Sequence, residues 1–158
     1  MASFKKIFLT RGLSTVVDAA DYEWLSQWGW YASFYGYAVR KEKIGDRWVV
    51  VWMHRSIMKT PKGMFTDHIS GDRLDNRRSN LRICTRQQNS MNIKPREGTS
   101  SKFRGVYWSK VAEKWQAYIN VDGKRNHLGL FLSEAEAAIA YNNAAVGYHG
   151  EFCRGNIL

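Results

Sequence analysis

Cysteine and proline are scarce in this sequence, and the shortage of cysteine excludes one kind of site. Of its 158 residues, 2 are cysteines and 2 are prolines. Cys84 and Cys153 stand alone, so no CxxC pair exists and a four-cysteine structural zinc site is excluded. A disulfide between the two stays open, but a pair of ordinary thiols in a reducing compartment is the simpler interpretation.

Long hydrophobic runs are also missing. The longest apolar stretch, residues 48–53, has the length of a strand and is far shorter than a transmembrane helix. The first residues contain neither the apolar region nor the cleavage site of a signal peptide. We therefore expect a soluble, cytoplasmic protein without a membrane partner.

Acidic residues are outnumbered, 14 against 24 basic ones, which gives a net charge of +10. This excess suggests nucleic acid as the partner, because lysine and arginine neutralise phosphates and release counterions. A membrane surface is the competing interpretation. With 44% apolar and 14% aromatic residues the chain can form a packed core, so global disorder is excluded.

Hydrophobic spacing and turn residues divide the first part of the chain into short elements. We predict a strand over 6–10 and a helix from Asp18, with Asp21 completing its capping box, to about Trp28. Two further strands, 30–41 and 47–53, flank a turn at 44–46. A short strand over 80–85 precedes a helix that begins with the capping box of Thr85 and Gln88.

Residues 93–102 have the composition of a linker, and the pattern changes after them. Strands are predicted over 103–109, 114–121 and 125–131, with a hairpin turn at 122–123. A capping box of Ser133 and Glu136 then starts an alanine-rich helix that runs to about Val146. The fold class is α+β, with domains over 1–96 and 102–158 joined by a linker at 97–101.

Between residues 67 and 92 the sequence is polar, basic and rich in Asp, His and Asn. Asp67 offers a hard oxygen ligand for magnesium or manganese, and the imidazole of His68 can deprotonate water. Neighbouring side chains on a strand point to opposite sides, so this pair should sit at an irregular strand end. Asn80 and Asn89 follow on a returning strand and a helix. Residue by residue, a solvated loop remains the alternative.

The order of these residues resembles the HNH motif of phage homing endonucleases. The resemblance runs from Met53 to Met91 through the segments Asp67-His68, Gly71-Asp72, Asp75-Asn76-Arg77, Asn80-Leu81 and Gln88-Asn89. It implies a ββα-metal (His-Me finger) fold, with a catalytic core over about 53–92 and one divalent metal. His54 resembles the structural histidine that precedes the family motif.

The resemblance also implies a role for each site residue. His68 is expected to be the general base and Asn80 to orient the His68 loop. Asp67 and Asn89 are expected to bind Mg²⁺ or Mn²⁺, and no structural zinc is expected. The products would carry 3′-hydroxyl and 5′-phosphate ends.

Arginines crowd the same stretch, where they can hold the phosphates that flank a cut. A solvated basic face is the alternative. The candidates are Arg73, Arg77, Arg78, Arg82 and Arg86.

The predicted second domain is a three-stranded antiparallel sheet packed on one helix, which leaves one face of the sheet free. Alternation places Trp115, Ala117, Ile119 and Leu128 against the helix. The free face mixes aromatic, amide and cationic groups, which suits the major groove of double-stranded DNA, although an ordinary polar face is the commoner case. Its candidate DNA-binding residues are Arg104, Tyr107, Lys114, Gln116, Tyr118, Asn120, Arg125 and His127.

The residues of this segment resemble the Apetala-type (ethylene-response-factor) DNA-binding domain. The resemblance covers residues 101–152 and rests on the strings FRGVYW, KWQAYI, HLGLF and SEAEAAIAYNNAAVGYHGEF. Arg104 and Arg125 match arginines of that family. Tyr107, Asn120 and His127 stand where plant members have arginine or tryptophan, so the plant target sequence is not implied.

Together these features predict a metal-dependent DNA endonuclease that cuts at a preferred site, similar to homing endonucleases. It would act as a monomer or a transient dimer on DNA, in the host cytoplasm if a phage encodes it. The alternative is a DNA-binding regulator with an inactive nuclease half. A nuclease acting on RNA is disfavoured because duplex RNA hides its major groove.

Overall fold

A computed structural model describes residues 3–92, 98, 100–153 and 155–157. The chain divides into two compact units, Met1–Asn89 and Ser90–Leu158. Residues 97 and 99 of the linker predicted at 97–101 lie outside the described residues. Within the described part of the chain, no helix is long and apolar enough to span a membrane.

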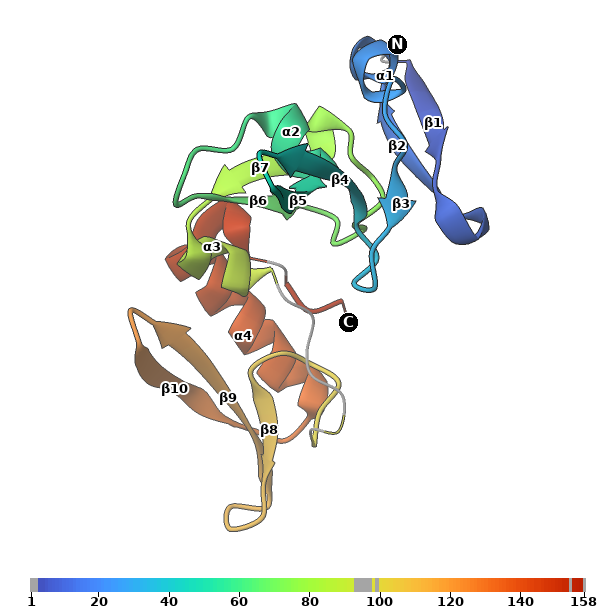
Figure 1. The fold of residues 1–158 in the computed structure, drawn as a ribbon. Coiled ribbons are helices and arrows are strands. Elements are labelled where there is room, and N and C mark those ends of the chain that lie inside the picture. The colour runs from blue at the N-terminus through green and yellow to red at the C-terminus, as the bar shows by residue number, and fades with distance from the viewer. Residues whose placement is uncertain (1–2, 93–97, 99, 154, 158) are drawn as a thin grey trace. The chain divides into compact units, whose positions relative to one another are not determined.

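The first unit begins with an antiparallel hairpin of β1 (Phe4–Phe8) and β2 (Ser14–Asp18), with the short helix η1 (Thr10–Gly12) between the strands. Helix α1 (Ala19–Leu25) follows directly and ends before Trp28 (Figure 1). The predicted Asp18 cap is wrong: the side chain makes no capping hydrogen bond and instead accepts one from the backbone N–H of Arg78, at 2.8 Å.

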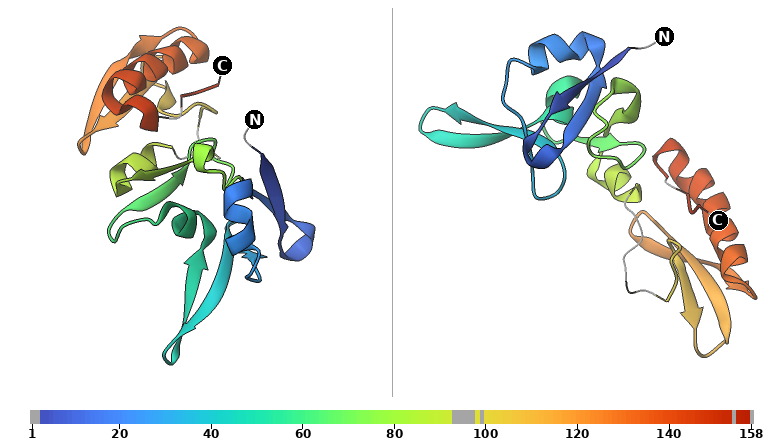
Figure 2. Two further views of the ribbon diagram at one scale, coloured as in Figure 1. Left: turned by 90° about the horizontal axis from the view of Figure 1, so that it is seen from above. Right: turned by 90° about the vertical axis from the view of Figure 1, so that its right-hand side faces the viewer.

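The segment predicted as one strand over 30–41 is two strands. Strands β3 (Tyr31–Ala32) and β4 (Ala38–Ile44) are separated by a turn that Ser33 closes through hydrogen bonds with Tyr37. Strand β5 (Arg47–Trp52) pairs with β4, and Ile44 opposite Arg47 confirms the predicted turn. Figure 2 shows the β4–β5 hairpin extending away from the other elements of this unit.

Helix α2 (Met53–Met58), which the sequence analysis missed, leads into an antiparallel ribbon. The ribbon consists of β6 (Phe65–His68) and β7 (Leu81–Cys84), with the short helix η2 (Arg78–Asn80) just before β7. Helix α3 (Arg86–Met91) follows. Its capping box is confirmed: Thr85 Oγ1 accepts from the Gln88 N–H at 3.2 Å, and Gln88 Oε1 accepts from the Thr85 N–H at 2.8 Å.

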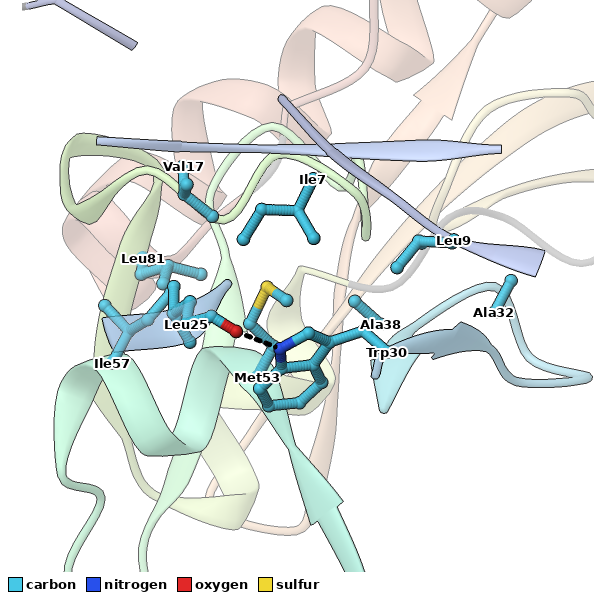
Figure 3. Close-up of a cluster of buried hydrophobic side chains, with 10 residues drawn as sticks. All are labelled: Ile7, Leu9, Val17, Leu25, Trp30, Ala32, Ala38, Met53, Ile57 and Leu81. Carbon is cyan, nitrogen blue, oxygen red and sulfur yellow. Dashed lines mark hydrogen bonds between the residues drawn. The ribbon is translucent and has the colours of Figure 1, made fainter. Parts of the chain in front are cut away.

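A single hydrophobic core joins the N-terminal hairpin to the ribbon (Figure 3). Trp30 is buried in this core and donates a hydrogen bond from Nε1 to the carbonyl of Leu25, at 2.8 Å. Met53, the first residue of α2, and Leu81, the first residue of β7, are buried in the same cluster. Each large side chain buried there contributes about 2 kcal/mol, so the ribbon depends on the hairpin for its stability.

The second unit is the predicted sheet and helix. Strands β8 (Val106–Ser109), β9 (Lys114–Val121) and β10 (Lys124–Phe131) form an antiparallel sheet with β9 in the middle. Helix α4 (Glu134–His149) covers one face and is followed by η3 (Gly150–Phe152) (Figure 1). The predicted capping box of α4 is confirmed, as is the burial of Ala117 and Ile119 against the helix.

The first strand of this sheet starts later than predicted, at Val106, because Gly105 makes a turn before it. Gly105 has a φ of +73°, and a Cβ at this position would overlap the Tyr141 ring and the Tyr118 carbonyl. The backbone can approach α4 this closely only without a side chain.

Candidate functional site

The β6–β7 ribbon and α3 carry the four residues of the predicted nuclease centre. Asp67 lies opposite Arg82 and His68 lies opposite Leu81 in the register of the ribbon. The pair does lie at the end of β6, but both residues keep the regular register of the ribbon, so only the expected irregularity is wrong. Successive strand side chains alternate in direction, and Asp67 and His68 accordingly have different partners.

His68 is the last residue of β6, and its imidazole is buried with only 4% of the residue exposed. Its Nε2 lies 3.2 Å from Oδ1 of Asn76, and its ring packs against those of His54 and Tyr37. Burial lowers the pKa of His68 from its ordinary value of 6.5, and the Asn76 hydrogen bond and nearby carboxylates oppose this shift. A buried imidazole that stays uncharged near neutral pH can accept a proton.

Asp67 is buried and paired with Arg82 across the ribbon. Nε and Nη2 of Arg82 donate to Oδ2 of Asp67 at 3.0 and 2.8 Å, and the two side chains are 12% and 8% exposed. The pair is charge-assisted and largely screened from water. A metal ion bound by Asp67 would share this carboxylate with the guanidinium.

Asn80 holds the loop that follows His68. Its Oδ1 accepts from the backbone N–H of Ser70 at 2.9 Å, and its Nδ2 donates to the carbonyl of Asp75 at 2.8 Å. The Asn80 carbonyl also accepts from the N–H of Ile69 at 2.8 Å. Asn80 is buried, so these bonds join both ends of the loop to the start of β7.

Asn89 is the fourth of the 6 residues of α3 and is half-buried. Its backbone N–H donates to the carbonyl of Thr85 at 3.0 Å, which keeps it within the helix that the capping box begins. In the described part of the chain, its side chain has no hydrogen-bond partner. The amide oxygen is therefore available as a ligand.

Asp67 and Asn89 would supply hard oxygen donors, which suit magnesium or manganese better than a soft metal. Among the residues the structure describes, no group of three or more His, Cys, Asp or Glu lies together. The donor set fits a cation that keeps most of its ligands as water and phosphate oxygens.

Two site residues have contacts that the sequence analysis did not foresee. Asn76 is fully buried, and its Nδ2 donates to Oγ1 of Thr15 at 2.7 Å. Asn76 stands in the quoted motif but received no role, and nothing in the sequence connects it to Thr15, which lies 61 positions away. His54 is 6% exposed, and its Nδ1 has no hydrogen-bond partner among the residues that the structure describes.

Three of the five predicted phosphate-binding arginines are already paired with carboxylates. Arg77 binds Asp75, Arg78 binds Asp21 and Arg82 binds Asp67. Arg73 donates to the carbonyl of Tyr35 and lies over the ring of Tyr37. Arg86 is exposed and, among the described residues, has no ion pair. The phosphate-binding proposal therefore rests on Arg73 and Arg86.

The free face of the second sheet forms an aromatic and cationic stack. The guanidinium carbon of Arg125 lies 3.9 Å from the ring centroid of Tyr118 and 5.2 Å from that of Tyr107. The His127 ring lies 4.9 Å from Tyr118, whose hydroxyl contacts Oε1 of Gln116 at 3.0 Å. Asn120 and Lys114 are exposed at the two ends of β9.

Arg104 does not belong to this face, which corrects the sequence analysis. It lies in the turn before β8, and its guanidinium donates to the carbonyls of Ser90, at 3.0 Å, and Met91. Its backbone N–H donates to Oδ1 of Asn156 at 2.7 Å. These contacts give Arg104 a structural role within the second unit.

Comparison with known proteins gives matches to both parts of the chain. The profile of a family described as HNH endonuclease matches residues 50–91, which include β6, β7 and α3. An ethylene-responsive transcription factor-like protein of Arabidopsis thaliana is 52% identical over 42 residues, which cover 27% of this chain and 18% of that protein. No solved structure matches the chain significantly.

Two viral proteins are similar over longer stretches. Protein 3.8 of Escherichia phage T7 is 35% identical over 60% of this chain and 77% of its own length. The protein named uncharacterized HNH endonuclease L560, of Acanthamoeba polyphaga mimivirus, is 32% identical over 94% of this chain and 78% of its own length. The match over residues 50–91 and the extent of the mimivirus similarity show that this chain belongs to the HNH endonuclease family.

Proposed function

We propose that the chain is a metal-dependent DNA endonuclease that hydrolyses phosphodiester bonds at preferred sites, as homing endonucleases do. The observation that carries the proposal is the buried, weakly basic imidazole of His68 at the end of β6, next to Asp67. A buried histidine of this kind is poised to take a proton from water.

In the proposed reaction, His68 accepts a proton from the attacking water, whose oxygen forms a bond to phosphorus. The bond from phosphorus to the 3′ oxygen breaks, which leaves a 3′-hydroxyl and a 5′-phosphate once that oxygen is protonated. HNH nucleases generally use a divalent metal, which when bound stabilises charge on the phosphate and on the departing oxygen. Asp67 and Asn89 would hold it, and Asn80 would keep the adjoining loop in place.

The second unit would act as an Apetala-type DNA-binding domain. Arg125 supports this role because its guanidinium is stacked on Tyr118, and a stacked planar guanidinium can form paired hydrogen bonds with a guanine edge. The net charge of +10 also favours DNA as the partner.

Plasmid cleavage tests the proposal. Purified protein should nick or linearise plasmid with Mg²⁺ or Mn²⁺, and EDTA should stop the reaction. His68→Ala should abolish cleavage while DNA binding stays nearly intact, and His149→Ala, at the end of α4, should cut normally. Equal cleavage by the wild type and His68→Ala would reject the assigned base. Binding without cleavage by the wild type would favour a regulator.

A further inference from the structure

A chain of three buried side chains connects the N-terminal hairpin to the imidazole of His68. Thr15 on β2 and Asn76 in the loop before η2 are both fully buried, with exposures of 0%. The chain runs from Thr15 Oγ1 to Asn76 Nδ2 at 2.7 Å, and from Asn76 Oδ1 to His68 Nε2 at 3.2 Å. Thr15 lies outside the segment 50–91 that matches the nuclease family.

The hydroxyl of Thr15 determines which way the Asn76 amide faces. Oγ1 lies 2.6 Å from the carbonyl of Leu74, and because a carbonyl only accepts, the hydroxyl must donate its single proton there. Toward Asn76 the same oxygen can then only accept. The group of Asn76 that faces Thr15 is therefore the donating NH₂, and its oxygen faces His68.

The orientation of Asn76 in turn selects the tautomer of His68. The amide oxygen of Asn76 can only accept a hydrogen bond, so Nε2 of His68 must carry the proton. In a neutral imidazole the basic lone pair is then on Nδ1. An amide turned the other way would present its oxygen to Thr15 and its NH₂ to His68, and would favour the opposite tautomer.

Backbone hydrogen bonds between β2 and residues 74–76 also hold Asn76 beside Thr15. The N–H of Val16 donates to the carbonyl of Leu74 at 2.9 Å, and the N–H of Asn76 donates to the carbonyl of Val16 at 2.8 Å. The segment from Leu74 to Asn76 thus lies along β2 like an added strand, with a parallel bridge between Val16 and Asp75. This pairing leaves the Asn76 side chain little freedom to move away from Thr15.

We propose that Thr15 and Asn76 are positioning residues that hold His68 in its Nε2–H tautomer and make Nδ1 the atom that accepts the proton of the attacking water. The inference rests on the proposed function, because it assigns the direction of the proton transfer in that reaction. It also assigns the N-terminal hairpin a part in the nuclease centre through Thr15, which is fully buried and would not touch substrate.

The tautomer can be read directly by long-range ¹H–¹⁵N correlation spectroscopy on the full-length ¹⁵N-labelled protein, without metal or DNA. The chain has 4 histidines, and His68→Ala identifies the signals of His68. The wild type should show His68 as the Nε2–H form. Thr15→Val, which keeps the shape but removes the hydroxyl, should give mixed tautomers, and Thr15→Ser should restore the wild-type spectrum.

Cleavage kinetics give the second measurement. Thr15→Val should lower kcat about tenfold or more with little change in KM, and Thr15→Ser should recover most of the rate, because the general base contributes at the chemical step. Asn76→Ala, if it folds, should lose more. A wild-type His68 protonated on Nδ1, or a Thr15→Val protein with the wild-type tautomer and rate, would overturn the inference. A wild type that cuts no DNA would instead refute the proposed function, and the spectra would still decide the tautomer.

Discussion

The guanidinium of Arg82 and the carboxylate of Asp67 face each other across the β6–β7 ribbon and are joined by two hydrogen bonds. Asp67 is also the proposed metal ligand, so the same carboxylate serves two cations. Because both groups are largely buried, neither can lose its partner without leaving a charge that water does not reach.

Arg82→Met should therefore destabilise the first unit by about 3 kcal/mol, since it removes the guanidinium that pairs with the buried Asp67 carboxylate. Mn²⁺ or Mg²⁺ should recover part of the loss, because a metal ion replaces the missing positive charge. Thermal unfolding with and without metal measures both effects. Arg86→Met is the matched control and should change neither, since Arg86 is exposed. Equal stability of the two variants would show that the ion pair contributes nothing.

His54 should make the stability of the first unit depend on pH. Burial, together with the charge of His68, lowers the pKa of His54 from 6.5 to about 3. Between these values the unfolded chain binds a proton that the folded chain excludes. Stability should be complete above about pH 6.5 and should fall as the pH decreases toward 3, by up to about 1.4 kcal/mol per pH unit.

His54→Phe should flatten this dependence, since the aromatic ring is kept and the titrating group is lost. The measurement is hydrogen exchange of the β6 and β7 amides between pH 4 and 8, which reports on the first unit alone. His127→Phe, at an exposed position of the second unit, is the control. A wild-type slope retained in His54→Phe would assign the acid sensitivity to other groups. The lowered pKa of His68 also makes the first unit less stable as the pH decreases, so His54→Phe should keep a smaller pH dependence of stability.

The capping box of α3 should matter for cleavage, because α3 carries Asn89. Thr85→Ala removes the acceptor of the Gln88 N–H and should destabilise the helix by about 1 kcal/mol. We expect faster amide exchange in α3, a higher metal concentration for half-maximal cleavage and unchanged DNA binding. Ser133→Ala removes the matching cap of α4 and should leave the metal dependence unaltered. Equal metal requirements for Thr85→Ala and the wild type would show that the capping box of α3 does not influence metal binding by Asn89.

Two substitutions of Arg125 distinguish the effect of its positive charge on DNA binding from the effect of its planar, stacked guanidinium. Arg125→Ala should weaken DNA binding and reduce the slope of log K against log salt by about one phosphate equivalent. Arg125→Lys keeps the charge but loses the planar group stacked on Tyr118, so it should keep the slope and lose sequence preference. Fluorescence anisotropy at several salt concentrations distinguishes the two. Wild-type affinity in Arg125→Ala would exclude this face.

Features set by neighbouring residues were predictable from the sequence. Both confirmed capping boxes involve residues three positions apart, and the burial of Ala117 and Ile119 follows from strand alternation. The split of the predicted strand over 30–41 was not foreseen, although Ser33 and Gly36 are turn residues, because the aromatic side chains around them favour a strand.

Features set by distant contacts were not predictable. Asp18 and Asp21 have the pattern of a capping box, yet Arg78 binds both of them from 60 and 57 positions away. Arg104 matches a DNA-reading arginine in sequence but binds backbone carbonyls. The motif indicated His68 and its companions, but the direction in which the His68 ring is protonated depends on Thr15, which no local pattern reveals.

The pairing of β2 with the loop around Asp75 has a consequence for engineering this protein. The family motif spans residues 50–91, but a transplant of that segment alone would leave Asn76 without its hydroxyl partner. It would also remove the part of the apolar core around Leu81 that comes from residues before 50. The smallest portable cutting module should therefore begin at β1, and chimeras that exchange nucleases between binding domains should be joined after α3, not before α2.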